Sequence, residues 1–146
     1  MNGVIMKKYF VSLFVGACWV VNVFASCTSS GDKDKVTAFY QQYAQAWCLT
    51  DRSQSVHQCD SLMSVYCTPA LCQEATNDPI GYDYATDDAG MDEMSLQTLQ
   101  VSKDGTDYKV SYKNNFKNDR YEKTIVQVSL KVVLENGKIS KVTKMQ

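Results

Sequence analysis

The chain has 146 residues, with 15 lysine and arginine residues against 16 acidic ones. This length allows one domain, and the near-balance of charge disfavours a nucleic-acid-binding protein. Apolar residues make up 45% of the chain and charged residues 21%, which is typical of a globular domain and not of a disordered one.

The N-terminus has the pattern of a secretory signal peptide. Lys7 and Lys8 precede an apolar run over residues 9–24, and small residues follow it. The run is shorter than the ~20 residues that cross a bilayer, and no second run of that length follows. We expect residues 1–26 to be removed on export, with Met6 as an alternative start. The remaining 120 residues then carry a formal charge of −3.

Two cleavage sites fit this signal. Val23-Phe24-Ala25 suits ordinary signal peptidase, with cleavage before Ser26. Phe24-Ala25-Ser26-Cys27 resembles the lipobox of bacterial lipoproteins, in which cleavage precedes a cysteine that is then lipidated.

The number of cysteines favours the lipobox. Cys18 leaves with the signal, and lipidation of Cys27 leaves an even set of four in an oxidising compartment. We expect a lipid anchor in the cell envelope, with residues 27–35 as a polar tether. Thr28 follows Cys27 where a sorting aspartate would otherwise stand, which favours the outer membrane.

Three helices are expected before the sheet. The first runs from residue 36 to about 48, because large apolar residues recur at helical spacing. Residues 50–58 are polar and predict a loop, and residues 59–66 predict a short second helix. Thr68 is a good N-cap with Pro69 at the first helical position, so a third helix begins there. The stripe of the first helix comprises Val36, Phe39, Tyr40, Tyr43, Ala44 and Trp47.

The remaining four cysteines predict two disulfides. With Thr68 as N-cap, Cys67 and Cys72 occupy the two positions that touch in a hydrophobic staple. Cys48 and Cys59 flank the predicted loop, and closing that loop is worth about 3 kcal/mol in the chain-entropy model. Four cysteines allow three pairings, of which we favour Cys48 with Cys59 and Cys67 with Cys72.

Residues 77–93 predict a loop, after which the apolar period changes from helical to alternating. Strands are expected over residues 94–101, 106–114 and 121–135, the second with Tyr108, Val110 and Tyr112 on one face.

Asn136-Gly137 predicts a hairpin turn, and the spacing of Ile139 and Val142 indicates a β-bulge. Helices followed by an antiparallel meander predict an α+β domain over residues 36–146, with the N-terminal helices packed on a curved sheet.

Several short motifs resemble a family of small Gram-negative lipoproteins classed as a domain of unknown function. The resemblance covers residues 36–146 and implies a cone-like fold, similar to nuclear transport factor 2 and to cystatin. It implies an envelope location and no particular activity, because this fold hosts enzymes, ligand binders and dimerisation modules. The motifs are Phe39-Tyr40…Tyr43, Leu62…Val65-Tyr66-Cys67-Thr68-Pro69-Ala70-Leu71, Tyr82-Asp83-Tyr84 and Gly137-Lys138-Ile139-Ser140-Lys141-Val142.

Metal and nucleophile chemistry find little support in the sequence. The cysteines lack the C-x-x-C spacing of structural zinc sites, and paired cysteines leave no thiolate nucleophile. His57 is the one histidine and lies in a polar segment. The acidic segment 83–93 lacks the order of residues of a calcium loop. We therefore expect no metal and no cofactor.

The aromatic residues point to a cavity. An apolar pocket with a few convergent polar groups is the usual form of a binding site, although ordinary packing would also bury these rings. The cavity candidates are Tyr40, Tyr43, Trp47, Tyr82, Asp83 and Tyr84.

These observations predict a lipid-anchored binding module for a small ligand or an envelope protein. Two alternatives stay open: an immunity-type protein that blocks a toxin, and a cavity-based enzyme that uses Asp83 or His57 for acid–base chemistry. A purely structural role is also open.

Overall fold

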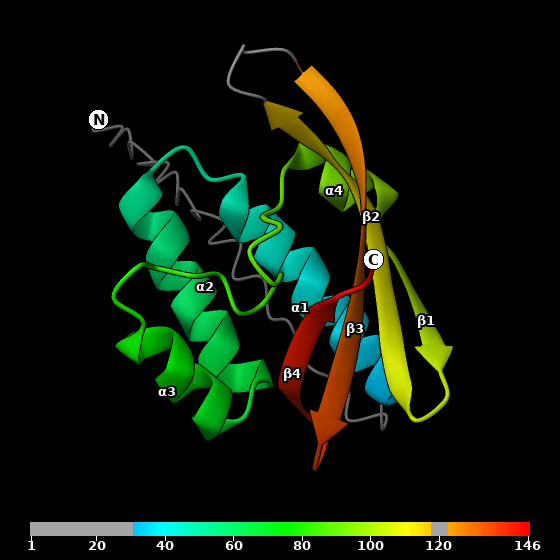
Figure 1. The fold of residues 1–146 in the computed structure, drawn as a ribbon. Helices are drawn as coiled ribbons and strands as arrows, with labels where there is room; N and C mark the ends of the chain where they lie inside the picture. Colours follow the sequence, from blue (N-terminus) through cyan, green and yellow to red (C-terminus); the bar gives the residue numbers. More distant parts are fainter. Residues whose placement is uncertain (1–30, 118–122) are drawn as a thin grey trace, which may run out of the picture.

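Four antiparallel strands follow one another in chain order in the computed structural model, which describes residues 31–117 and 123–146 (Figure 1). The sheet order is β1-β2-β3-β4. The predicted signal peptide and the lipidation site at Cys27 lie outside the described residues. The strands are β1 Gln100–Asp104, β2 Asp107–Lys117, β3 Lys123–Glu135 and β4 Lys138–Lys144.

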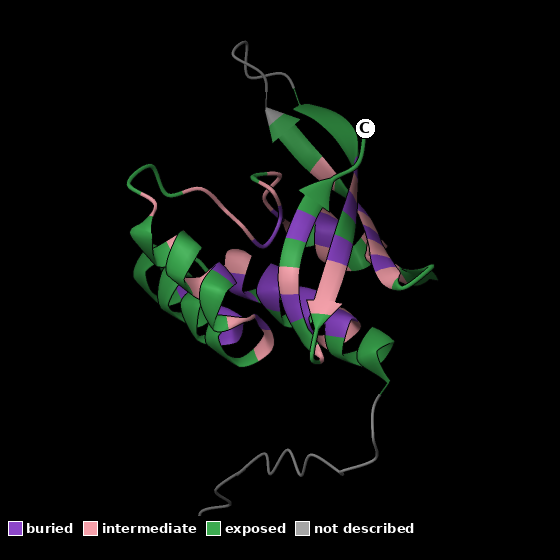
Figure 2. Ribbon diagram, turned by 60° about the horizontal axis from the view of Figure 1, so that its bottom comes forward, coloured by how far each residue is buried: buried purple, intermediate pink, exposed green. Residues whose placement is uncertain are grey.

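The helices pack on one face of this open sheet and leave the other face uncovered (Figures 1 and 2). Helix α1 lies against the sheet. Helix α2 packs on α1, and α3 contacts the last strand, β4. The α+β class predicted from the sequence is therefore confirmed. The helices are α1 Asp32–Trp47, α2 Arg52–Tyr66, α3 Pro69–Asn77 and α4 Glu93–Thr98.

Strict alternation in β2 and β3 builds the sheet side of the core. Tyr108, Val110 and Tyr112 are buried on one face of β2, as predicted. Their partners across the ladder from β3 are buried too, because residues directly opposite share a face. These partners are Val132, Leu130 and Val128.

The β3–β4 hairpin has the predicted turn and bulge. Asn136 and Gly137 both have positive φ values, 52° and 74°, which is the conformation of a two-residue type I′ turn. Lys141 pairs with Val133 and Ile139 with Leu134, so Ser140 is the extra residue of the bulge.

Thr68 caps α3 as predicted, and it ties the helices to the sheet edge. Its hydroxyl accepts a hydrogen bond from Leu71 N, and Pro69 is the first helical residue. The Thr68 backbone N–H donates to the carbonyl of Ile139 in β4, at 2.8 Å. The corner between α2 and α3 is thereby fixed against the last strand.

Three predicted boundaries were wrong, two of them because an aspartate caps a helix N-terminus. Helix α1 begins at Asp32, so residues 32–35 of the predicted tether are helical. Helix α2 begins at Arg52 because the Asp51 carboxylate caps Ser53 N and Gln54 N, so most of the predicted loop over residues 50–58 is helix.

The third wrong boundary concerns the strand predicted over residues 94–101. Asp92 and Ser95 form a capping box that starts the short helix α4, and the strand begins only at Gln100. Both the backbone N–H and the hydroxyl of Ser95 donate to the Asp92 carboxylate. No helix in the described part of the chain combines the length and the apolar character needed to cross a membrane.

Candidate functional site

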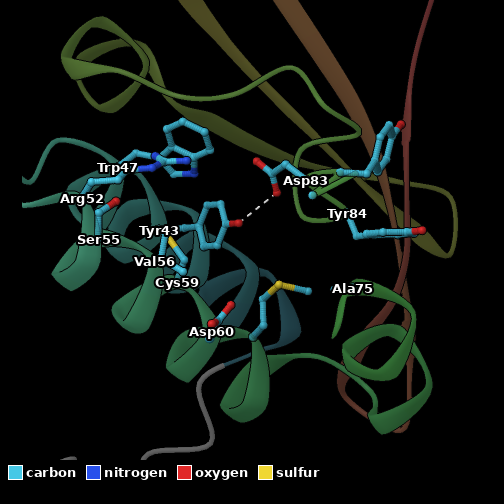
Figure 3. Close-up of a pocket in the computed structure, with 13 residues that line it drawn as sticks. Tyr43, Trp47, Arg52, Ser55, Val56, Cys59, Asp60, Ala75, Asp83 and Tyr84 are labelled. Carbon is cyan, nitrogen blue, oxygen red and sulfur yellow. Dashed lines mark hydrogen bonds between the residues drawn. The ribbon is translucent and has the colours of Figure 1, made fainter. Parts of the chain in front are cut away.

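A cavity of about 270 Å³ lies between α1, α2 and the loop that precedes α4 (Figure 3). This volume is close to the lower limit of small-molecule sites, which is roughly 300 Å³. Tyr43 and Trp47 line it from α1, one helical turn apart, and Ala75 lines it from α3. The contribution of α2 comprises Arg52, Ser55, Val56, Cys59, Asp60 and Met63, and that of the loop comprises Gly81, Tyr82, Asp83 and Tyr84.

Asp83 fastens the loop to α1. Its carboxylate accepts hydrogen bonds from the Tyr43 hydroxyl at 2.9 Å, the Thr86 hydroxyl at 2.6 Å and the Ala85 backbone N–H at 3.0 Å. Burial raises the pKa of Asp83 above its usual value, although these hydrogen bonds act against the shift. Asp83 therefore holds the loop and also brings a desolvated carboxyl group to the cavity wall.

Tyr43 is buried next to this carboxyl group, and its hydroxyl is committed to it as a donor. Burial and the nearby Asp83 charge raise the pKa of Tyr43 far above its usual value. Tyr43 is therefore a neutral hydrogen-bonding group at any physiological pH and not a base.

Two tyrosines of the loop form the opposite aromatic wall. The Tyr82 and Tyr84 rings pack edge to face, with centroids 5.0 Å apart. The Tyr82 hydroxyl donates to Asp87, whose other oxygen accepts from Lys144 N at 2.7 Å. These bonds tie this wall to the end of β4.

Trp47 brings an unused donor to the cavity. Its indole Nε1 is buried and makes no hydrogen bond of good geometry within the described residues, although the Tyr43 hydroxyl lies close enough to interact with it. The exposed guanidinium of Arg52 lies over the ring, with Cζ 5.2 Å from the ring centroid. Because an unpaired buried N–H is costly, a bound molecule with an acceptor atom would stabilise this arrangement.

The four cysteines of the described residues are free thiols, which differs from the two predicted disulfides. Cys59 lines the cavity, and burial raises its pKa to about 11. Burial likewise raises the pKa of Cys67 to about 12. Thiols with such pKa values are poor nucleophiles near neutral pH. Cys72 lies in the first turn of α3, where its thiol donates to the Met63 carbonyl.

Five of the six cavity candidates from the sequence line this one pocket: Tyr43, Trp47, Tyr82, Asp83 and Tyr84. The sixth, Tyr40, does not. It is fully buried, and its hydroxyl donates to the Ala85 carbonyl at 2.9 Å. Tyr40 therefore supports the loop from beneath.

His57 lies apart from Asp83. It is exposed on α2 and is not among the residues that line the cavity. Of the two acid–base candidates, only Asp83 therefore lies at the cavity. Within residues 31–117 and 123–146, no group of three or more histidine, cysteine or acidic side chains is placed to hold a metal ion.

Sequence reasoning missed the α2 side of the cavity. Arg52, Ser55 and Val56 fall in the segment predicted as a loop, whereas the helix turns them toward α1 and the aromatic loop (Figure 3). The N-cap at Asp51 was the available signal for this longer helix.

Comparison with known proteins gives a likeness of fold. No protein-family model matches the chain, and no curated protein matches it. The crystal structure of a protein of unknown function from Bacteroides thetaiotaomicron resembles this chain with a TM-score of 0.56 and 20% sequence identity. The matched region covers 77% of this chain and 88% of that protein.

A second solved structure shares the fold at lower identity. This is the solution structure of TraH from the Gram-positive conjugative plasmid pIP501, which is 14% identical with a TM-score of 0.52. The matched region covers 80% of this chain and 96% of the TraH chain. At such identities the likeness concerns the fold alone, so the function has to be argued from the pocket and surfaces of this chain.

Proposed function

We propose that this chain is an exported, lipid-anchored binding module that holds a small molecule in the cavity between α1 and α2. The observation that carries the proposal is the buried Trp47 Nε1 without an acceptor in an aromatic-lined cavity. The export signal and the lipidation of Cys27 rest on the sequence pattern of residues 1–27.

The cavity chemistry suits a small molecule with an apolar body and an acceptor group. The rings of Tyr43 and Trp47 and the side chains of Val56 and Met63 offer apolar contact. Trp47 Nε1 offers a hydrogen bond, and the exposed Arg52 guanidinium can meet a carboxylate. Benzoate combines an aromatic ring with a carboxylate, which makes it a suitable first probe.

Trp47 itself supplies the readout. The sequence has one other tryptophan, Trp19, which lies in the predicted signal peptide, so the exported protein reports on the cavity alone when tryptophan is excited selectively. Titration with benzoate is expected to change this fluorescence saturably, whereas the cationic analogue benzylamine leaves it unchanged. Arg52→Gln should weaken benzoate binding by about two- to fivefold, because an ion pair with an exposed guanidinium is worth ~0.2–1 kcal/mol.

A matched pair of alanines controls for indirect effects. Ala75 lines the cavity, whereas Ala70 is exposed on the same helix, α3. Ala75→Phe should fill the space and abolish the benzoate response, and Ala70→Phe should preserve it. Equal responses in both variants would refute binding in this cavity. An acyl mass on Cys27 of the protein isolated from the envelope tests the anchor separately.

A cavity-based enzyme is the second candidate, and the raised pKa of Asp83 is the observation that favours it. In that case the carboxyl group would exchange protons with the bound molecule. Chemical conversion of a bound probe that is lost in Asp83→Asn but kept in Arg52→Gln would favour the enzyme over the binding module.

A further inference from the structure

Charge is divided unequally along this nearly neutral chain. Residues 36–99 hold nine acidic residues and a single cation, Arg52. Residues 100–146 hold ten lysine and arginine residues and five acidic ones. Since the first segment forms most of the helical layer and the second forms the sheet, the helical layer is acidic and the sheet is basic. Such asymmetry commonly marks proteins that bind charged surfaces.

Strand register gathers the lysines on the uncovered face of the sheet. Lys109 and Lys113 alternate with the buried tyrosines of β2 and therefore face away from the helices. Lys131 of β3 lies directly opposite Lys109, and Lys141 of β4 lies opposite Val133 on the same face. Lys123, at the start of β3, continues the row by the same alternation. We call this face, with Lys109, Lys113, Lys123, Lys131 and Lys141, the basic face.

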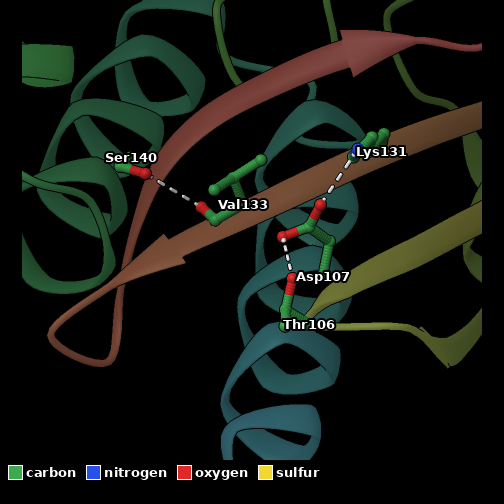
Figure 4. A network of polar contacts seen from close by, with 5 residues as sticks. All are labelled: Thr106, Asp107, Lys131, Val133 and Ser140. Carbon is green, nitrogen blue, oxygen red and sulfur yellow. Dashed lines mark hydrogen bonds and ion pairs between the residues drawn. The ribbon is translucent and has the colours of Figure 1, made fainter.

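The acidic residues of this face lie at one end of the sheet. Asp104 and Asp107 flank the β1–β2 turn, and Glu135 ends β3. Asp107 pairs with Lys131 at 3.0 Å (Figure 4). This is the only ion pair on the basic face among the described residues. Within this described part of the chain, the other lysines of the basic face have no acidic partner on it.

Two lysines of the basic face lie opposite each other across the ladder, and the Asp107 carboxylate balances the charge of only one of them. Lys109 and Lys131 are directly opposite, and like charges in that arrangement destabilise a sheet. The positions between the lysines are hydroxyl or amide residues, such as the opposed Ser111 and Ser129 and the nearby Gln127. A surface of phosphate groups would relieve the repulsion and accept hydrogen bonds from these side chains.

We propose that the basic face binds the anionic headgroups of the membrane to which the chain is anchored. The domain then lies with its sheet on the bilayer and turns the acidic helices and the cavity toward the aqueous side. The inference rests on the proposed anchor, which brings the domain to a membrane. Ile125 also lies on this face, with 59% of its surface exposed, and it can enter the headgroup layer.

The short predicted tether is compatible with this orientation. Helix α1 begins at Asp32, five residues after Cys27, and an extended chain spans about 3.3–3.6 Å per residue, or roughly 17 Å here. The start of α1 lies beside the β3–β4 turn, where Lys35 Nζ approaches Gly137. A tether that spans at most this length keeps the start of α1, and with it the adjacent edge of the sheet, near the headgroups.

Lysine accessibility in vesicles tests the proposal with the full chain. The protein is reconstituted into phosphatidylcholine alone, or into phosphatidylcholine with one third phosphatidylglycerol, and its lysines are acylated with a membrane-impermeant reagent. Mass spectrometry should show Lys109, Lys131 and Lys141 modified several-fold more slowly in the anionic vesicles. Lys103 and Lys144, whose ladder partners Tyr108 and Leu130 face the helices, should react equally in both. The protection should vanish near 1 M salt, where the screening length is about 3 Å.

Charge-matched variants decide whether the basic face is responsible. Each lysine near an anionic membrane contributes about fivefold to the binding constant, so three contribute about a hundredfold. The triple variant of Lys109→Gln, Lys131→Gln and Lys141→Gln should lose the protection of Lys113 in anionic vesicles. The control that combines Lys103→Gln, Lys138→Gln and Lys144→Gln removes the same charge away from this face and from the anchor, and should keep the protection.

The other outcomes overturn the proposal or separate it from the anchor. Equal modification in both vesicle types, or equal loss in both triple variants, overturns it. Protection that grows with protein concentration without anionic lipid also overturns it, because the acidic helices of a second copy then cover the basic face. Protection without an acyl mass on Cys27 supports headgroup binding while refuting the lipid anchor. An acyl mass on Cys27 without protection of the lysines supports the lipid anchor and overturns headgroup binding.

Discussion

Helix α1 has two interfaces, and they are built differently. Against the sheet, Tyr40 and Ala44 join Val110, Tyr112 and Leu130 in a core where every one of these side chains is fully buried. Against α2, the same helix presents Tyr43 and Trp47 to a cavity of about 270 Å³. One side of α1 is therefore filled, and the other side is hollow.

The difference assigns separate tasks to the two interfaces. The sheet interface buries continuous apolar surface, which is the dominant source of folding free energy. The α2 interface holds its loop through the Asp83 carboxylate and leaves Trp47 Nε1 without an acceptor. We infer that the sheet interface supplies most of the stability and the α2 interface supplies the binding site.

The largest expected effect on the free energy of unfolding comes from truncating one large apolar side chain at each interface. Leu130→Ala should lower the free energy of unfolding by about 3 kcal/mol, because the site is closed and keeps the cavity left behind. Met63→Ala should cost about half as much, because it enlarges an existing cavity that solvent can enter. Urea unfolding of both variants measures the difference. Equal losses would show that the cavity is closed and packed in solution.

A surface change on α2 calibrates this comparison. Val65 is 62% exposed, so Val65→Ala should change stability by less than about 0.5 kcal/mol. A larger loss would mean that α2 itself is sensitive to alanine substitution, and the Met63 result would then need correction.

The next effect concerns the Asp92 carboxylate, which joins α4 to β2. It accepts from Ser95 N and from both nitrogens of Asn115, at 2.9 to 3.0 Å. Burial acts to raise the pKa of Asp92, but these hydrogen bonds outweigh burial and leave the pKa lowered. A lowered pKa means that the contribution to stability is present above the unfolded value and is lost as the pH falls through the folded value. Asp92→Asn should therefore cost about 2 kcal/mol at neutral pH and less in acid.

Asp83, on the cavity side, should respond to pH with the opposite sign. Burial raises its pKa, so its contribution to stability is greatest in acid and falls as the pH rises through the folded value. The destabilisation by Asp83→Asn should therefore be larger in acid than at neutral pH. Urea midpoints of both variants across this pH range test the signs. Parallel curves for Asp83→Asn and Asp92→Asn would contradict the assigned environments.

The sheet interface was largely predictable from the sequence, for a local reason. Alternation of period two fixes which side of β2 and β3 is buried, and Asn136-Gly137 fixes the turn that follows. The Thr68 cap of α3 was equally local. Caps were also the source of two errors. Asp51 extends α2 into a polar segment, and Asp92 starts α4 in a segment whose apolar residues lack the helical period.

The cavity was predictable only in part, because its two halves depend on different information. The aromatic residues of α1 and of the loop over residues 82–84 stand out by composition. The α2 half depends on where a long polar helix packs, and no local pattern around Ser55 or Met63 encodes that position. The basic face needs the register of three strands, which pairs Lys109 with Lys131 across residues far apart in sequence.

The smallest expected effects on the free energy of unfolding come from removing one polar group on each side of α1. Tyr40→Phe removes a hydroxyl that donates to the buried Ala85 carbonyl, so it should cost about 1–2 kcal/mol. Trp47→Phe removes apolar surface but also an N–H without an acceptor, and the two effects should cancel to within about 1 kcal/mol. Urea unfolding without added probe measures both variants. A loss at Trp47 that exceeds the loss at Tyr40 would mean that a water molecule already satisfies Nε1, and a ligand would then have to displace that water to bind.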